Sequence, residues 1–295
     1  MKKCIATLIA CISVLTLLFC TVLSVSAESS ASLTLVYRRS DESFSDLSIS
    51  TYKVAELTAD GEYRLCSKFA DYPVQIYSVK SQAEWKKITS TLAAYIRADS
   101  IAPDLSGVTD ADGSVAYTDV GAGLYLTLSV YREADGITVV FEDFITAVSD
   151  AGNVSAYPKY EIHQPMPGDV EFKVVKQWKD TGAADKRPSE VKIDILREGS
   201  VVESVTLSPA NDWCYKWMAP NDRSAWYAVE RDVPDGYKVS VASDGRTIIV
   251  TNTYESSQEP PDTGDTEVLW HYLALMCVSG VLLITLGVIR MRIEK

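Results

Sequence analysis

Short alternating strands separated by turn residues fill the middle of this sequence and restrict it to a β fold. Apolar and polar residues alternate with period two in SLTLVYR, SISTYKVAEL, GLYLTLSV, TVVFEDFITAV, EVKIDILRE and RTIIVTNTY, with Gly, Asp, Asn and Pro between these stretches. Such alternation places one face of a strand in a core and the other in water. Short strands with frequent turns favour β-sandwiches, so we expect a mainly β protein.

One helix and one linker divide this β-rich region. Ser81 and Glu84 form a capping box, which four apolar residues follow at helical spacing: Trp85, Ile88, Leu92 and Ile96. Residues 161–169, EIHQPMPGD, combine two prolines and a glycine without periodicity and predict a linker. The chain is therefore expected to hold two β-sandwich domains, 28–160 with the helix and 170–254 without one.

Two apolar segments flank these domains. The amino end has two lysines, an apolar stretch and small residues before Ala27, which predicts a signal peptide at 1–27 cut between Ala27 and Glu28. An uncleaved membrane anchor is the alternative.

The second apolar segment, residues 268–289, contains no Asp, Glu, Lys or Arg. It is long enough to cross the ~30 Å hydrocarbon layer of a membrane. The basic tail at 290–295 predicts a cytoplasmic carboxyl end, so the body of the protein is expected outside the cell.

Charge and residue types narrow the possible functions. Residues 28–263 hold 37 acidic and 23 basic residues, a net charge of −14, which argues against nucleic acid and anionic membranes as partners. Only Cys66 and Cys214 lie outside the two apolar segments, in different predicted domains, so no disulfide framework is expected. The two histidines, His163 and His271, fall in the predicted linker and membrane span. We expect no metal, no cofactor and no enzyme that turns over repeatedly.

Three polar residues of the second domain fall on apolar strand faces. Every second residue of a strand lies on the same face. By this count Lys176 shares its face with Val174 and Trp178, Asn252 with Val250, and Glu230 with Ala228. A lone buried charge is costly, and burial favours a neutral lysine beside a protonated glutamate. Lys176 could then attack the Asn252 amide and expel ammonia while Glu230 moves the protons. A hydrogen-bonded Lys–Glu pair with Asn252 at a turn is the alternative.

The same region carries five motifs in a fixed order. They are K-x-W from Lys176, R-P at 187–188, L-x-x-x-N-x-W at 207–213, E-x-x-x-P-x-G-Y from Glu230, and T-N-T at 251–253. Together they resemble the collagen-adhesin B-type (CnaB) domain of Gram-positive surface proteins over residues 170–254. The resemblance implies an intramolecular isopeptide bond with Lys176 as nucleophile, Asn252 as acceptor and Glu230 as catalyst.

The first domain has a looser resemblance. TYKVAEL, TDADGSVAYTDVGAGLYL and AYPKY are similar to the amino-terminal domain of pilin-like proteins of that group. Its first strand offers Arg38 and Arg39 but no lysine, so the same crosslink is not expected there. The D-x-D-G run at 110–113 predicts a turn.

In sortase-assembled pili a lysine after Tyr-Pro accepts the next subunit, which makes Lys159 a candidate for linkage. Tyr160 replaces the asparagine of that motif, so an exposed lysine at a strand end is the alternative.

The run PPDTG at 260–264 resembles the L-P-x-T-G sorting signal. Motif, apolar span and basic tail follow one another within 255–295 as sortases require, and Pro260 stands where leucine is usual, before Pro261 and Asp262. The resemblance implies that a sortase cuts between Thr263 and Gly264 and joins the Thr263 carbonyl to peptidoglycan. An unprocessed single-pass membrane protein is the alternative.

These features predict a cell-wall-anchored surface protein. We expect a structural pilin-like subunit or stalk, whose partners are sortase, peptidoglycan and other pilin subunits. The alternative is an adhesin that binds a host or matrix ligand through residues 28–160.

Overall fold

The computed structural model describes residues 31–134, 136–164, 167–222 and 224–255. The predicted signal peptide with its Ala27–Glu28 cleavage site, the PPDTG motif, the apolar span and the basic tail lie outside these residues. Within the described part, no helix is long and apolar enough to cross a membrane. The described residues form a mainly β structure with a single α-helix.

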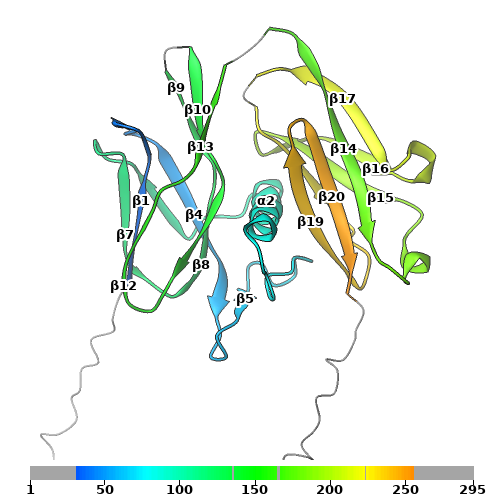
Figure 1. The fold of residues 1–295 in the computed structure, drawn as a ribbon, viewed down its shortest axis with the longest axis horizontal. Coiled ribbons are helices and arrows are strands. Elements are labelled where there is room, and N and C mark those ends of the chain that lie inside the picture. Colours follow the sequence, from blue (N-terminus) through cyan, green and yellow to red (C-terminus); the bar gives the residue numbers. More distant parts are fainter. Residues whose placement is uncertain (1–30, 135, 165–166, 223, 256–295) are drawn as a thin grey trace, which may run out of the picture. The chain divides into compact units, whose positions relative to one another are not determined.

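Thirteen strands build the amino-terminal half, residues 31–163 (Figure 1). They are β1 (Ala31–Val36), β2 (Arg38–Arg39), β3 (Glu42–Ser43), β4 (Ser48–Leu57), β5 (Tyr63–Leu65), β6 (Leu105–Val108), β7 (Ser114–Val120), β8 (Gly123–Thr127), β9 (Val130–Ala134), β10 (Ile137–Phe141), β11 (Phe144–Val148), β12 (Gly152–Ala156) and β13 (Tyr160–His163). Their sheets have the orders β12-β1-β7, β11-β8-β4-β5 with β6 on β4, and β13-β10-β9, and β2 pairs with β3. Inward-facing apolar residues such as Leu33, Leu35 and Phe141 fill one core of this half.

Seven strands build the carboxyl-terminal half, residues 169–254. They are β14 (Asp169–Lys179), β15 (Val191–Arg197), β16 (Ser200–Leu207), β17 (Cys214–Pro220), β18 (Trp226–Glu230), β19 (Tyr237–Asp244) and β20 (Thr247–Tyr254), with the 3-10 turns η1 (Ala184–Lys186) and η2 (Pro209–Asn211). The sheet orders are β17-β14-β20-β19 and β16-β15-β18. The first and last strands of this half, β14 and β20, are therefore neighbours, and they run parallel (Figure 1).

Helix α2 (Gln82–Ala98) confirms the predicted helix. Ser81 caps its amino end by accepting a hydrogen bond from the Glu84 backbone N–H at 3.2 Å. The Glu84 carboxylate accepts from the Lys80 N–H instead of the Ser81 N–H, so only one half of the expected capping box forms. The apolar stripe is buried, with Leu92 and Ile96 at most 1% exposed.

Helix α2 packs against strands of both halves. One hydrophobic cluster joins residues of α2, β4 and β8 to residues of β15, β18, β19 and β20. The helix contacts β18 and β19 in particular, and Thr91 Oγ1 accepts a hydrogen bond from the Val241 N–H at 2.8 Å. The sequence indicated two separate sandwiches, whereas in the structure the helix of the first contributes to the core of the second.

Two segments differ from the sequence-based expectation. Strand β13 extends to His163 and pairs with β10, so the segment that connects the halves is shorter than the expected 161–169 linker. The stretch TVVFEDFITAV, expected as one strand, is split into β10 and β11 at Glu142 and Asp143. The Asp143 carboxylate accepts hydrogen bonds from the Ser129 N–H at 2.7 Å and from Arg97 at 2.8 Å, which draws this part of the chain out of the ladder.

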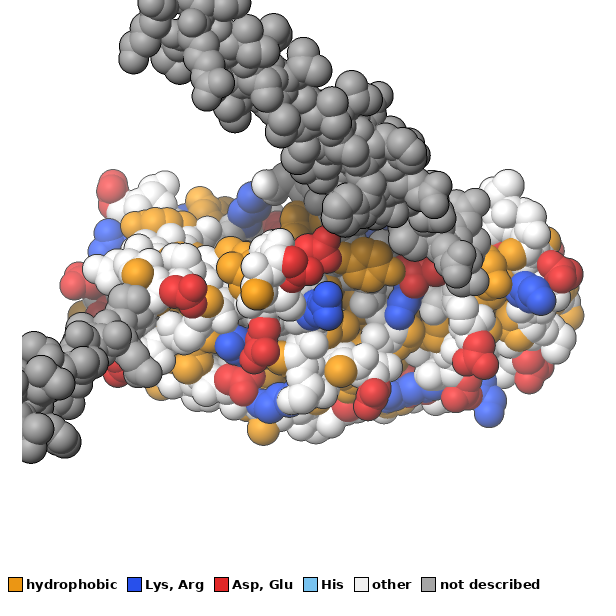
Figure 2. All heavy atoms as spheres, turned by 90° about the horizontal axis from the view of Figure 1, so that it is seen from below, with side chains coloured by type: hydrophobic (Ala, Val, Ile, Leu, Met, Phe, Trp, Pro, Cys, Tyr) orange, Lys and Arg blue, Asp and Glu red, His pale blue; other side chains and the backbone are white. Residues whose placement is uncertain are grey.

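The visible surface is consistent with a highly charged chain of mixed sign. Figure 2 shows acidic and basic side chains interspersed over one face, with apolar side chains between them. The large apolar side chains that are exposed among the described residues include Tyr157, Met218 and Val202. Scattered apolar residues of this kind are common on folded proteins and do not define a binding surface.

Candidate functional site

The carboxyl-terminal half brings Lys176, Glu230 and Asn252 together in its interior. In the parallel ladder of β14 and β20, Lys176 lies opposite Val250 and Trp178 opposite Asn252, so Lys176 and Asn252 share the inner face two positions apart. Glu230 ends β18, a strand of the facing sheet. The exposed fractions are 4% for Lys176, 1% for Glu230 and 0% for Asn252. Strand alternation alone placed all three correctly on inward faces.

Their polar atoms lie within reach of one another. Lys176 Nζ is 3.5 Å from Glu230 Oε2, and Asn252 Nδ2 donates a hydrogen bond of 2.8 Å to Glu230 Oε1. Lys176 Nζ also donates to the Gln177 carbonyl at 3.1 Å. Among the described residues, no hydrogen-bond partner is present for the buried Asn252 Oδ1. The glutamate therefore lies between the amine and the amide and contacts both.

Burial shifts both ionisable groups toward their neutral forms. Desolvation lowers the pKa of Lys176 to about 8, although the nearby Glu230 carboxylate opposes this shift. Desolvation raises the pKa of Glu230 above its usual value, against the influence of Lys176 and of the hydrogen bond from Asn252. A medium that excludes water penalises charge on either group. Burial thus makes the neutral amine and the protonated carboxylic acid easier to reach, relative to the charged forms, than they would be in water.

An aromatic ring lies over the Lys176 amine, next to a buried ion pair. The Trp178 ring lies 4.1 Å from Lys176 Nζ, and the Arg187 guanidinium lies 5.6 Å from the same ring. Arg187 binds the buried Asp180 carboxylate through two hydrogen bonds of 2.6 Å, and Tyr237 Oη donates to Asp180 at 3.0 Å. Sequence analysis recorded Arg187 and Tyr237 only as motif positions and missed Asp180. A carboxylate two positions after the tryptophan of the K-x-W motif, on the same strand parity as Lys176 and Trp178, was the available signal.

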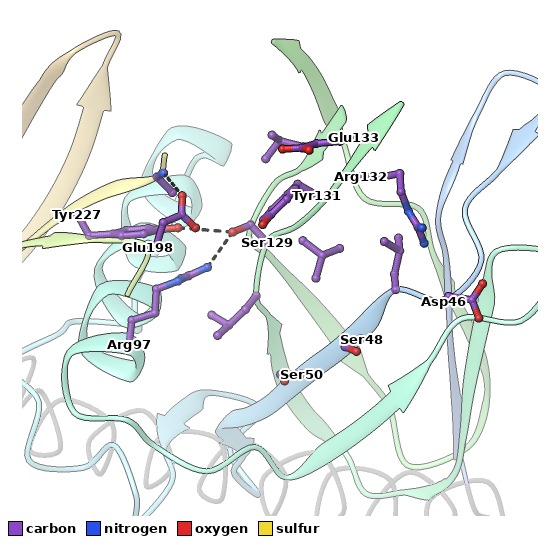
Figure 3. Close-up of a pocket in the computed structure, with 15 residues that line it drawn as sticks. Asp46, Ser48, Ser50, Arg97, Ser129, Tyr131, Arg132, Glu133, Glu198 and Tyr227 are labelled. Carbon is purple, nitrogen blue, oxygen red and sulfur yellow. Dashed lines mark hydrogen bonds between the residues drawn. The ribbon is translucent and has the colours of Figure 1, made fainter. Parts of the chain in front are cut away.

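A second polar cluster lies where α2 meets the carboxyl-terminal half (Figure 3). Arg97 Nη2 donates to Asp143 Oδ1 and to Ser129 Oγ, each at 2.8 Å, and its guanidinium lies 4.4 Å from the centre of the Tyr227 ring. Arg97 and Asp143 are only 11% and 14% exposed. No sequence pattern indicated this cluster, because its members come from α2, from loops of the amino-terminal half and from β18.

The remaining candidate residues lie elsewhere. Lys159 is exposed just before β13, and its backbone carbonyl accepts from the Glu142 N–H at 2.9 Å. The Asp110 carboxylate accepts from the backbone N–H groups of Asp112 and Ser114, which makes D-x-D-G a side-chain-capped turn. Within the described residues, no group of His, Cys, Asp and Glu could hold a metal ion, and Cys66 and Cys214 are free thiols.

The carboxyl-terminal half is similar to domains of known proteins. The family model of the Cna protein B-type domain matches residues 172–253. These residues form a CnaB-type domain. All three buried polar residues, Lys176, Glu230 and Asn252, lie inside the CnaB-type domain. A collagen adhesin of Staphylococcus aureus is 29% identical over 96 residues, which is 30% of this chain but only 8% of the adhesin.

Solved structures give more distant likenesses. A single B repeat unit of the Staphylococcus aureus collagen-binding surface protein has 12% identity and a TM-score of 0.29, covering 77% of this chain and 98% of the repeat unit. A shaft pilin of Lactobacillus rhamnosus GG has 15% identity and a TM-score of 0.26, with the same two coverages. The family assignment of the CnaB-type domain does not depend on either.

Proposed function

We propose that the CnaB-type domain ties β14 to β20 through an amide bond between Lys176 Nζ and Asn252 Cγ, with Glu230 as the proton-transfer group. One observation carries this proposal: the Lys176 amine and the Asn252 amide both contact the Glu230 carboxyl group, and all three side chains are buried. Burial moves the pKa values of Lys176 and Glu230 in the directions that the reaction requires.

The reaction is a single transamidation. The neutral Lys176 amine attacks Asn252 Cγ, and Glu230 donates a proton to the amide oxygen as the tetrahedral adduct forms. Glu230 then takes a proton from the attacking nitrogen and passes it to Nδ2. The Cγ–Nδ2 bond breaks, ammonia leaves, and the Glu230 carboxylate takes back the proton on the oxygen as the carbonyl re-forms. Lysine amine plus asparagine amide give one secondary amide plus ammonia, and Glu230 ends in the protonation state in which it began.

The orientation of the Asn252 amide decides which atom faces the acid. In the structure Nδ2 donates to Glu230, as suits an ionised carboxylate. A half-turn of the amide exchanges its oxygen and nitrogen, which have nearly the same shape. A protonated Glu230 would then donate to Oδ1, the atom that lacks a partner in the present orientation. The same cavity can therefore hold the carboxylate form and the reactive form.

The expected role of the bond is mechanical. Because β14 and β20 are parallel neighbours, tension applied through the two ends of the CnaB-type domain would shear the ladder between them. A covalent link from Lys176 to Asn252 carries that tension directly and leaves residues 177–251 unloaded. This property suits a stalk or pilin-like subunit of a bacterial surface, which is the function we propose for the whole chain.

Attachment to the cell wall is the second part of the proposal. It is supported by the sequence of the carboxyl end, where PPDTG, an apolar span and a basic tail follow one another. The partners are then a sortase, which cuts after Thr263, and peptidoglycan. Lys159, which is exposed, is the candidate for linkage to a further subunit.

Intact mass tests the crosslink. Recombinant residues 28–255, which include every described residue, are expected to be one ammonia lighter than their sequence. Lys176→Met and Glu230→Gln should each have the full sequence mass, because the first removes the nucleophile and the second the transferable proton. Lys179→Met, which changes an exposed lysine at the end of the same strand, is the matched control and should still lose ammonia. A wild-type mass equal to the sequence would refute the bond.

A further inference from the structure

Glu230 lies at the end of an edge strand. In its three-stranded sheet, β18 pairs with β15 alone, so the other edge of β18 has no strand beside it in that sheet. The terminal residue of an edge strand is held by fewer backbone hydrogen bonds than a central residue. The carboxyl group that contacts both reacting residues therefore sits where the CnaB-type domain alone gives its backbone little support.

Helix α2 of the amino-terminal half supplies support at this point. Tyr95 Oη donates a hydrogen bond of 2.9 Å to the backbone carbonyl of Glu230. Tyr95 is 5% exposed, and its ring packs on that of Tyr72 with centroids 4.6 Å apart, so the hydroxyl has little freedom to move away. The hydrogen bond spans 135 positions of sequence and joins the two halves directly at the candidate catalyst.

The next residue is tethered to the same helix. Arg231 Nη1 lies 2.6 Å from Oδ1 of Asp99, the C-cap residue that follows α2, and its Nε pairs with Asp194 of β15. Arg231 and Asp99 are both about one-third exposed, so this ion pair contributes more to geometry than to stability. Two consecutive residues, Glu230 and Arg231, are thus fixed by the carboxyl-terminal turn of α2.

We infer that α2 positions Glu230 for crosslinking through Tyr95 and Asp99, so that bond formation in the CnaB-type domain depends on docking of the amino-terminal half. This inference rests on the proposed Lys176–Asn252 bond. Glu230 must approach Lys176 and Asn252 at once, and displacement of a catalytic group by about 1 Å can slow a reaction by about two orders of magnitude. Tyr95 acts as a positioning residue, because it contacts the backbone of Glu230 and neither reacting atom.

Refolding kinetics test this inference. Residues 28–255 are recovered in urea from inclusion bodies, in which the protein has not folded, and the starting mass is checked for the absence of ammonia loss. The protein is then diluted out of urea and followed by tryptophan fluorescence for folding and by intact mass for ammonia loss. Tyr95→Phe is expected to slow ammonia loss about fivefold after folding is complete, the effect of one lost hydrogen bond of ~1 kcal/mol. Tyr125→Phe is the matched control, since Tyr125 Oη also donates to a backbone carbonyl, that of Gly121 at 2.8 Å, and contacts neither α2 nor β18 in this way, so it should react at the wild-type rate.

A second pair of measurements separates positioning from stability. In a Lys176→Met background, which cannot crosslink, Tyr95→Phe and Tyr125→Phe should lower the urea midpoint by similar amounts, because each loses one hydrogen bond to a backbone carbonyl, although only Tyr95→Phe slows the reaction. Arg231→Gln should also slow ammonia loss, because it releases the second tether. Wild-type rates in both Tyr95→Phe and Arg231→Gln would overturn the inference. A wild-type protein that never loses ammonia would instead overturn the proposed bond.

Discussion

At the residue scale, the proposed crosslink would replace buried charge with a neutral bond. An ion pair between Lys176 and Glu230 would place two charges in an interior where both side chains are fully buried. Desolvation of such a pair can exceed its Coulombic attraction. Amide formation removes the lysine charge permanently and leaves the glutamate free to be neutral. The proposed reaction is thus favoured by the same burial that makes the unreacted pair costly.

The pH dependence of ammonia loss is expected to be bell-shaped. The reactive form, neutral Lys176 with protonated Glu230, carries the same number of protons as the ion pair, so its population is constant between the two macroscopic pKa values. Above about pH 8 the pair loses its remaining proton, and well below the raised pKa of Glu230 both groups are protonated. Initial rates of mass loss after refolding at different pH values measure this profile. A rate that kept rising far above pH 8 would contradict it.

At the element scale, α2 belongs to one hydrophobic cluster that both halves share. Its apolar stripe, with Leu92 and Ile96, belongs to the core shared with β4 and β8, and Thr91 and Tyr95 bond to β19 and β18. At the same junction Arg97 donates a hydrogen bond to Asp143. Its guanidinium also lies over the Tyr227 ring (Figure 3). The helix is therefore the element of the amino-terminal half that contacts β18, the strand that ends in Glu230.

Loss of Arg97 is expected to destabilise the protein strongly. Arg97→Met leaves the mostly buried Asp143 carboxylate without its cation and should lower the free energy of unfolding by about 2 kcal/mol. Urea titration in the Lys176→Met background measures this change. The double variant Arg97→Met/Asp143→Asn should recover part of the lost stability.

Lys86→Met is the matched control, because Lys86 is 72% exposed and its amine lies 3.8 Å from Glu142. It should change the free energy of unfolding by less than ~0.5 kcal/mol. Equal effects of the two single variants would contradict the argument.

Local periodicity predicted some elements and could not predict their partners. Alternation placed Lys176, Glu230 and Asn252 on inward faces, because strand geometry links sequence parity directly to side-chain direction. Helical spacing likewise located α2. The bond from Tyr95 to Glu230 had no such signal: it joins residues far apart in sequence, and a tyrosine beside an apolar stripe is typical of any helix. The same holds for Arg97 and Asp143, which meet only once the chain has folded.

At the scale of the whole molecule, the proposed crosslink and the proposed anchor complement each other. A protein fixed at its carboxyl end experiences force along its length, and the CnaB-type domain is the part that lies next to the sorting motif in the sequence. A domain whose first and last strands are covalently joined cannot be extended by that force without breaking a bond.

The proposed wall attachment would give the protein a defined new carboxyl end. After muramidase digestion of cell walls, peptide mapping is expected to find a carboxyl-terminal peptide that ends at Thr263 and carries a peptidoglycan fragment. Peptides from 268–295 should be absent from this fraction, because the apolar span is removed by the cut. A Thr263→Ala variant should shift the protein from the wall to the membrane fraction. Recovery of the intact span with wall-associated wild-type protein would refute sortase processing.

The direction of β14 and β20 also determines how far the CnaB-type domain reaches. Since these strands are parallel, the chain arrives at one end of the sheet and departs at the opposite end. The eleven residues of β14 rise ~3.3 Å each, so the two attachment points are separated by about 36 Å. An antiparallel arrangement would return the chain to the edge at which it began. The CnaB-type domain therefore separates its two attachment points by the length of a strand, and copies joined end to end would lengthen a chain in proportion to their number.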